Sequence, residues 1–421
     1  MTSPLALLGG APAVIEPGPH FSWPLLDGRT DKAVLDQLHR SISVYDRSDV
    51  VAELENALQE YFGVRHAVLT SSGTAALHST YAACGIGPGD EVIVPAYTFL
   101  ATVTPLLHLG AVPVLADCDA TGNLSLSDVA ARITPDTVAI MVTHLWGIPA
   151  DLAALRQLAD ARGLLLLEDG SHAHGAAVAG RKVGSVGDLA AFSMNGPKPL
   201  SAGEGGFVLT NDDEAYYRLL LHGHYNKRCR SEIPGEHPLH RYAVTGMGLK
   251  FRIHPLAAAI ALDQLERLDS YLIGRVNMAD YLCFELGQLP GITVPELALG
   301  TRAAWYGLPL TYVPAELDDL PVERFYDALR AEGLDELDRP GSTCPLNLLP
   351  LFQDLGPLFP HHPHRDRIAY RPGQFPVAEQ LHRTTLKLPV WHREEDVPLA
   401  RQYVAGFRKV VAHHHDLKDN S

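Results

Sequence analysis

The sequence has no apolar run that approaches the roughly 18 residues of a helical membrane span. It also has little positive charge, because 34 Lys and Arg stand against 49 Asp and Glu and give a formal net charge of −15. Proteins that bind nucleic acid need a basic surface, which this balance does not offer. We therefore expect neither a membrane nor a nucleic acid among the partners of this chain.

Paired cysteines and metal-binding motifs are also missing. The five cysteines are widely scattered and include no CxxC pair, which predicts no disulfide framework and fits reduced thiols in a cytoplasm. The 21 histidines include no HExxH or comparable spacing, so we predict no metal site. Most histidines, including His413–His415, are expected to be surface or packing residues.

Predicted strands alternate with predicted helices along the first part of the chain. The strands are expected at His66–Leu69, Glu91–Val94, Val112–Ala116, Thr137–Val142 and Leu164–Glu168. Such alternation implies right-handed crossovers and a mostly parallel sheet that is covered on both faces. The sequence therefore predicts an α/β fold, and 421 residues are too many for one compact core.

The division into domains follows the composition. Residues 1–30 are rich in Pro and Gly and are expected to form an arm, followed by a large domain at 31–290. The composition shifts towards Pro from Gly291, where we place a smaller C-terminal α/β domain at 291–421. Within the large domain, GHYNKRCRSEIPG is predicted to be a loop, and two successive helices are expected from Pro255 to about Leu289.

The stretch FSMNGPKPLSAGEGG, Phe192–Gly206, presents a single lysine from an irregular loop. Lys198 stands between two prolines, and a glycine-rich turn follows it. Proline interrupts regular hydrogen bonding and glycine permits unusual backbone angles, so the loop has a defined, non-repetitive shape. Alone, such a lysine is more often an ordinary surface residue.

A second stretch, TSSGTAALH at Thr70–His78, reads as a strand, a turn of small residues and a helix. This order places free backbone N–H groups and hydroxyls at a helix N-terminus, which is an anion site. The alternative is an ordinary N-cap by Ser72 or Thr74.

Three groups of residues follow predicted strands: Gly73-Thr74, Phe99 and Asp169. Ligands of parallel sheets gather beyond the carboxyl ends of the strands, so we expect the three to meet at one edge. Taken singly, an aspartate that caps a turn and an aromatic core residue are the simpler interpretations.

Together, FSMNGPKPLSAGEGG, LLLLEDGSHAHGA (Leu164–Ala176) and TSSGTAALH resemble the pyridoxal-phosphate (PLP) enzymes of the DegT/DnrJ/EryC1/StrS aminotransferase family. The resemblance extends from LALLGG near the start to LKLPVWHREEDV near the end. It implies PLP fold type I, like that of aspartate aminotransferase, and a family that makes amino sugars, aminocyclitols and related antibiotic building blocks.

The resemblance also implies the chemical roles of three residues. Lys198 matches the lysine that binds PLP as a Schiff base, and its released amine would serve as the general base of transamination. Asp169 matches the carboxylate that faces the pyridine nitrogen and keeps it protonated. His172 matches the position that contacts the ring hydroxyl.

Five further residues match cofactor-binding positions of the family. Ser171 matches a small residue packed under the PLP ring, and Phe99 matches the aromatic residue that stacks on it. Gly73, Thr74 and Ser193 match the residues that bind the phosphate.

The chain departs from the family pattern where a second subunit reaches the phosphate. The family often has Asn-Tyr-Arg where this chain has Lys250-Phe251-Arg252. Either Lys250 or Arg252 suits a phosphate by charge. The resemblance therefore implies a homodimer with shared active sites.

The predicted function is a PLP-dependent aminotransferase that aminates a keto-sugar or keto-cyclitol, with glutamate or glutamine as amino-acid donor, in antibiotic or other secondary metabolism. LALLGG and SAGEGG favour the cyclitol and aminohydroxybenzoate branch. One alternative is PLP-dependent dehydration, although relatives with that chemistry replace the lysine with histidine. Another is a non-catalytic PLP-binding subunit, which the intact Lys198 and Asp169 argue against.

Overall fold

The computed structural model describes residues 4–418. Its centre is a seven-stranded sheet with the order β1-β10-β9-β6-β5-β2-β4. The strands are β1 (His66–Thr70), β2 (Glu91–Pro95), β4 (Val112–Ala116), β5 (Thr137–Thr143), β6 (Leu165–Asp169), β9 (Leu189–Ser193) and β10 (Gly206–Thr210). β10 pairs antiparallel with both neighbours, and the pairs from β9 to β4 are parallel. The predicted mostly parallel sheet is confirmed.

Successive residues of the central strands alternate between two hydrophobic cores, because side chains of a strand point to opposite faces. In β5, Ala139 and Met141 belong to one core, while Ile140 and Val142 belong to the other. Helices α3 (Gly73–Ala83), α4 (Thr104–Leu109) and α7 (Asp213–Gly223) cover the first face. Helices α2 (Asp49–Phe62), α5 (Leu126–Arg132), α6 (Leu152–Arg162) and the first half of α9 (Pro255–Leu286) cover the second face. The sheet is therefore buried on both faces, as predicted.

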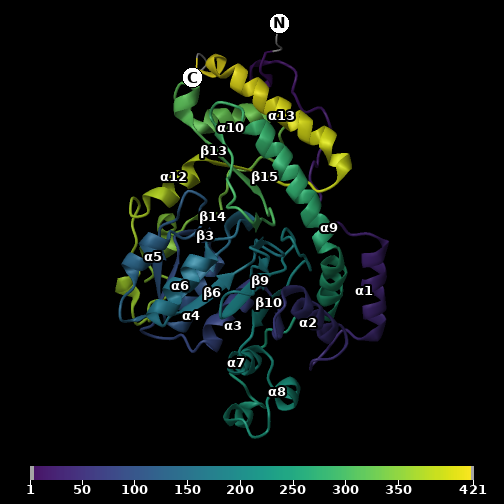
Figure 1. Cartoon of the computed structure of the whole chain (residues 1–421), viewed down its shortest axis with the longest axis vertical. Coiled ribbons are helices and arrows are strands. Elements are labelled where there is room, and N and C mark those ends of the chain that lie inside the picture. The colour runs from purple at the N-terminus through teal and green to yellow at the C-terminus, as the bar shows by residue number, and fades with distance from the viewer. Residues whose placement is uncertain (1–3, 419–421) are drawn as a thin grey trace.

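Helix α9 (Pro255–Leu286) is one continuous element of 32 residues, where the sequence predicted two helices. It runs from the central sheet to the upper part of the molecule (Figure 1). Glycine normally weakens a helix, but a Cβ at Gly274 would lie 2.0 Å from the carbonyl oxygen of His392. Gly274 therefore permits a close approach of the chain after β15 (Thr385–Leu388) and does not break the helix.

A third core lies at the end of the molecule that holds both termini (Figure 1). It contains the small sheet β11 (Ile292–Thr293), β13 (Leu308–Tyr312) and β15 (Thr385–Leu388), with the helices α10 (Val322–Ala331) and α13 (Val397–Ala412). The N-terminal arm packs here, and the N–H of Ala6 donates to Glu332 Oε1 at 2.8 Å. The first long helix, α1 (Gly28–Arg40), follows the arm and is capped by Asp27.

One segment of the predicted C-terminal domain returns to the central sheet. Strand β14 (Thr343–Pro345) pairs with β3 (Tyr97–Phe99), and Leu346, Phe352 and Phe375 join the first core. The short helices α11 (Pro350–Gln353) and α12 (Pro376–Thr384) belong to this segment. The boundary after residue 290 stays a prediction.

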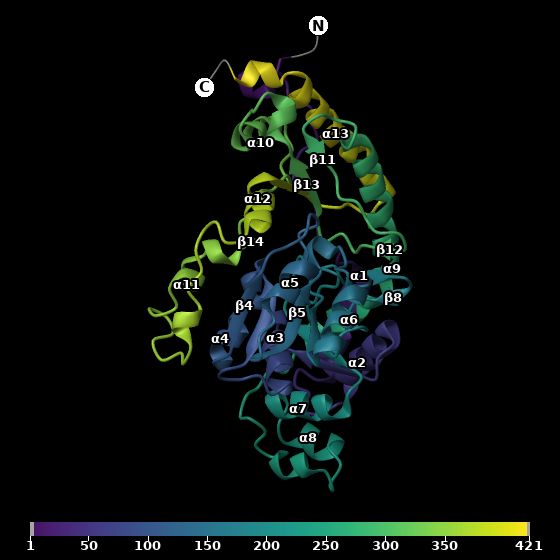
Figure 2. The same cartoon turned by 60° about the vertical axis from the view of Figure 1, so that its left-hand side comes forward.

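The predicted loop GHYNKRCRSEIPG contains helix α8 (Lys227–Glu232), so that prediction was wrong. Arg228 is buried and forms an ion pair with Glu55 at 2.8 Å, and it pairs with Glu232 one turn later. The basic residues of this stretch suggested a solvent-exposed loop. The stretch is instead helical, because the charge of Arg228 is neutralised by Glu55 and Glu232 inside the protein. Helices α7 and α8 lie at the end of the molecule opposite the termini (Figure 2). No helix within residues 4–418 is long and apolar enough to cross a bilayer.

Candidate active site

A cavity of about 380 Å³ lies at the carboxyl edge of the central sheet. Eight of the ten predicted site residues line it: Gly73, Thr74, Phe99, Asp169, Ser171, His172, Ser193 and Lys198. They come from the start of α3, the end of β3, the end of β6 with its following turn, and the end of β9 with the lysine loop. The structure therefore brings together the residues that the strand order placed at one edge. Their individual roles stay predictions.

Lys198 reaches the cavity from a loop that is fixed by backbone contacts. Its N–H donates to the carbonyl of Asn195, and its own carbonyl accepts a hydrogen bond from the Trp23 indole at 2.8 Å. Removal of the amine from water lowers the pKa of Lys198 to about 8, against the opposing attraction of Asp169. A substantial fraction of this amine is thus neutral near physiological pH, which nucleophilic attack on a carbonyl requires.

Asp169 is buried at the end of β6, and its carboxylate is held from both sides. Its Oδ2 accepts a hydrogen bond from the hydroxyl of Thr102 at 2.7 Å, and its Oδ1 accepts one from the N–H of Ser171 at 3.1 Å. These bonds fix the orientation of a buried charge, which is costly to bury without a partner. The arrangement fits a carboxylate that faces the protonated ring nitrogen of PLP.

His172 lies between aromatic neighbours with one nitrogen unsatisfied. Its ring stacks on Tyr306 with centroids 4.1 Å apart, and the Tyr306 centroid lies 4.6 Å from Lys198 Nζ. Burial, and then the charge of Lys198, hold the pKa of His172 well below its usual range. Nothing within residues 4–418 hydrogen-bonds its buried Nδ1. A neutral imidazole with a free ring nitrogen fits a contact with a polar group of PLP.

The start of α3 forms a cradle that suits a phosphate. Ser72 caps the helix by accepting from the N–H of Ala75 at 3.1 Å, and Gly73 and Thr74 supply N–H groups of the first turn, which have no partner inside the helix. A Cβ at Gly73 would lie 2.4 Å from Cβ of Ser193. Only glycine lets the helix N-terminus approach the end of β9 so closely, and this observation supports a phosphate-binding role for the pair.

Lys250 and Arg252 do not line the cavity. Lys250 is exposed and its backbone bridges to His224, while the Arg252 guanidinium lies 5.4 Å from the ring centroid of Tyr45. Both cations were predicted to serve the site of a second subunit, and that role stays a prediction.

Sequence reasoning missed several lining residues: Ser72, Thr98, Thr102, Thr143, Asn195, Glu204, Tyr306, Ser342 and Thr343. Thr102 lies three residues after Phe99, the one residue of this segment that the sequence marked as a site candidate. Tyr306 comes from the region predicted to be another domain, and no local motif marks it. Asn195 and Glu204 bracket the lysine loop and hydrogen-bond to each other at 2.8 Å.

Known proteins resemble this chain over most of its length. The model of the DegT/DnrJ/EryC1/StrS aminotransferase family matches residues 27–401. The GDP-perosamine synthase of Caulobacter vibrioides is 39% identical over 67% of this chain and 74% of its own. The L-glutamine:scyllo-inosose aminotransferase of Streptomyces griseus is 38% identical over 82% of this chain and 84% of its own. The crystal structure of an aminotransferase from Psychrobacter cryohalolentis superposes with a TM-score of 0.82 at 27% identity, and covers 94% of this chain and 100% of that one.

Proposed function

The chain belongs to the DegT/DnrJ/EryC1/StrS aminotransferase family, and we propose that it transfers an amino group from glutamine or glutamate to a ketone on a cyclitol or sugar ring. It is a PLP-dependent aminotransferase of fold type I. The observation that carries the proposal is the cavity in which Lys198, with a pKa of about 8, lies with the buried Asp169.

Each of four cavity residues would have a separate role in transamination. Bound PLP supplies an electron sink for the carbon that loses a proton. Asp169 would hold the proton on the ring nitrogen, and His172 would orient the ring through its free nitrogen. Lys198 would attach the cofactor and, once released, move the proton at the substrate carbon. Phe99, which is 40% exposed at the cavity wall, would shield the ring from water.

The lining favours an uncharged polyol as amino acceptor. Hydroxyl side chains are plentiful, and among the described residues that line the cavity Lys198 is the only Lys or Arg. A nucleotide-linked sugar brings a diphosphate, which proteins bind with cations or helix N-termini. The helix N-terminus here is assigned to the phosphate of PLP, and so are the cations Lys250 and Arg252 that the proposed second subunit would bring, so neither is left for a diphosphate. We therefore favour a keto-cyclitol over a nucleotide-linked keto-sugar, within antibiotic or related secondary metabolism.

A homodimer with shared active sites completes the proposal. Lys250 and Arg252 lie beside exposed apolar side chains, including Tyr242, Val244 and Met247, which are 46–57% exposed. Clustered apolar exposure is typical of an interaction surface. A two-fold axis would bring this surface of each chain to the site of the other. We place the dimer in the cytoplasm, where scattered cysteines stay reduced.

An acceptor screen tests the function. The purified holoenzyme is given L-glutamine with either scyllo-inosose or a GDP-linked keto-hexose, and the aminated product is measured by mass spectrometry with Lys198→Ala as the blank. We expect amination of the cyclitol. Turnover of the GDP-linked ketone alone would overturn the assignment of substrate class. Failure of every ketone, with no spectral response of the cofactor to either amino acid, would overturn the proposed function.

A further inference from the structure

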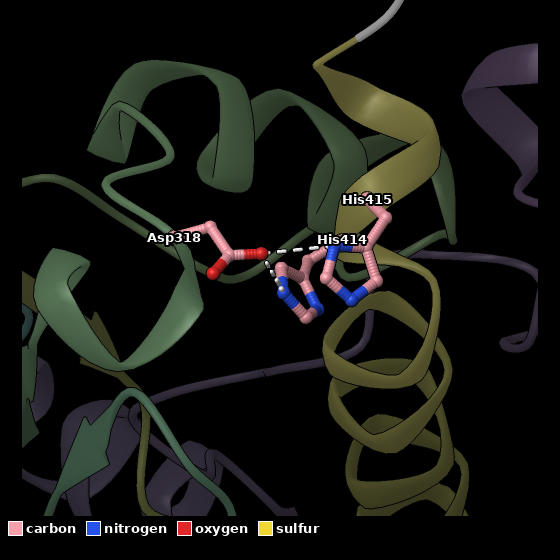
Figure 3. A group of neighbouring side chains, drawn as sticks. All are labelled: Asp318, His414 and His415. Carbon is pink, nitrogen blue, oxygen red and sulfur yellow. Dashed lines mark hydrogen bonds and ion pairs between the residues drawn. The ribbon is translucent and has the colours of Figure 1, made fainter.

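Three side chains with metal-binding atoms converge far from the active site, at the end of the molecule that holds the termini. Asp318 follows the short helix η5 (Pro314–Leu317), while His414 and His415 begin η9 (His414–Leu417) after α13. Asp318 Oδ2 lies 3.2 Å from Nε2 of His414 and 2.9 Å from Nδ1 of His415. One ligand atom from each residue lies within 4.8 Å of the other two (Figure 3).

Both ring nitrogens of His414 face an oxygen atom. Its Nδ1 lies 2.8 Å from the carbonyl oxygen of Val411, and its Nε2 faces the carboxylate of Asp318. With its N–H directed at the Val411 carbonyl, the imidazole presents the lone pair of Nε2 towards Asp318. A metal ion held between the two would take both the nitrogen and the carboxylate oxygen as ligands.

The spacing and the surroundings suit a metal ion. Zinc binds imidazole nitrogen and carboxylate oxygen at about 2.0–2.2 Å, and tetrahedral geometry then separates neighbouring ligand atoms by roughly 3.3 Å. The two measured separations from Asp318 Oδ2 are close to that value. The bond from His414 Nδ1 to the Val411 carbonyl is the outer contact that metal-binding histidines usually make. The side chains of His415 and Asp318 are 70% and 51% exposed, which leaves room for a water ligand.

We propose that Asp318, His414 and His415 bind one divalent transition-metal ion such as Zn²⁺, with water in the fourth position. Two imidazoles and one carboxylate select Zn²⁺ and its neighbours over Mg²⁺ and Ca²⁺, which prefer oxygen ligands throughout. The ion ties the end of α13 to the turn that precedes α10. This site is separate from the proposed function, since none of its residues lines the active-site cavity. No local sequence pattern marks this site, because Asp318 and His414 are 96 residues apart.

The test is zinc binding to the holoenzyme, produced without a polyhistidine tag and freed of metal by dialysis against chelator. Isothermal titration with ZnCl₂ is expected to give one equivalent per chain, while MgCl₂ gives no heat. His414→Ala and Asp318→Asn should each weaken zinc binding by at least about 10-fold, the size of effect that loss of even an outer contact has.

Two neighbouring substitutions are matched controls. His413→Ala removes a histidine whose Nδ1 faces Asp416 instead, and Asp319→Asn changes the next residue, which also has a positive φ. Both variants should bind zinc as the wild type does, because neither removes a proposed ligand. Asparagine also tolerates the positive φ of residue 319, so Asp319→Asn should not disturb the backbone.

Thermal unfolding gives an independent measurement. Zinc should raise the Tm of the wild type and of both controls, but not that of His414→Ala or Asp318→Asn, because a ligand of the folded state stabilises it. Wild-type protein that takes up no zinc would overturn the proposal. Equal zinc affinity in His414→Ala, Asp318→Asn and the wild type would overturn it as well.

Discussion

At the scale of single residues, the candidate active site holds an amine and a carboxylate, Lys198 and Asp169, that are buried close to each other. Burial lowers the pKa of Lys198, while Asp169 opposes that shift. Asp169 is in turn held by the hydroxyl of Thr102 and the N–H of Ser171. The amine is therefore reactive and the carboxylate is fixed before any ligand arrives, which is the preorganisation that electrostatic catalysis needs.

The substitution Asp169→Asn tests the carboxylate. An amide can accept from the N–H of Ser171 and donate to the hydroxyl oxygen of Thr102, so the variant should fold and bind cofactor. Without a negative charge to hold the ring nitrogen protonated, kcat should fall by about 10²-fold or more, as for removal of one preorganised electrostatic contact. The measurement is steady-state turnover together with the cofactor absorbance. Turnover near that of the wild type would show that another carboxylate has this role.

The lowered pKa of Lys198 makes a pH prediction. Uptake of PLP by the apoenzyme requires the neutral amine, so its rate should rise with pH and level off above about 8. Asp169 raises the pKa of this amine, so Asp169→Asn should move the midpoint to lower pH. Stopped-flow absorbance at a series of pH values measures both. A midpoint near 10.5, the value of an exposed lysine, would contradict the burial of this amine.

The sequence predicted those site residues that lie in local motifs, and missed those that arrive by tertiary packing. Lys198 and Asp169 stand in recognisable stretches beside a strand end. Tyr306 stacks on His172 in the cavity, and no sequence pattern near residue 306 predicts that contact. His414 was expected to be a surface or packing residue, because its carboxylate partner is distant in the chain.

At the scale of elements, the positions of strands that are buried on both faces were the easiest to predict from the sequence. Runs such as Leu164–Glu168 are short, apolar and bounded by turn residues, so their identity follows from composition. Helix α8 and the continuity of α9 were missed, because each depends on a partner elsewhere. Glu55 neutralises Arg228 in α8, and the backbone of His392 fills the space beside Gly274 in α9.

The junction of α3 with β9 is the element contact on which the proposed phosphate binding depends. Gly73→Ala would place a Cβ 2.4 Å from Cβ of Ser193, so the helix N-terminus must move away from the strand. We expect weaker PLP binding and a loss of about 1–3 kcal/mol in the free energy of unfolding, typical of overpacking. PLP titration and urea denaturation measure the two effects.

Gly87→Ala is the matched control for this prediction. Gly87 lies in the loop after α3, and a Cβ there meets nothing within 4 Å. It should leave both PLP affinity and stability close to those of the wild type. If Gly73→Ala also binds PLP as the wild type does, the α3 N-terminus is not the phosphate site.

At the scale of the whole molecule, the proposed dimer places residues of each chain in the site of the other. Lys250 and Arg252 lie outside the cavity of their own chain, on a surface with exposed apolar side chains. An isologous interface would present both cations to the partner. The resemblance predicted this arrangement, whereas no property of an isolated chain could establish it.

Mixed dimers test the sharing of sites. A Lys198→Ala chain and a Lys250→Ala/Arg252→Ala chain should each be inactive as homodimers. Coexpressed with different tags and purified as heterodimers, they should recover one working site, which combines an intact Lys198 with the cations of its partner. The absence of activity in verified heterodimers, or a fully active monomer on sizing, would refute shared sites.

The most direct test of the account is the identity of the lysine that binds the cofactor. Borohydride reduction of the holoenzyme, followed by peptide mapping, fixes the pyridoxyl group on that residue. The account predicts a label on Lys198, and the closest rival is Lys387, whose Nζ lies 6.0 Å from the ring centroid of Tyr306. A label on Lys387 or any other lysine, or no label at all, would contradict the central claim.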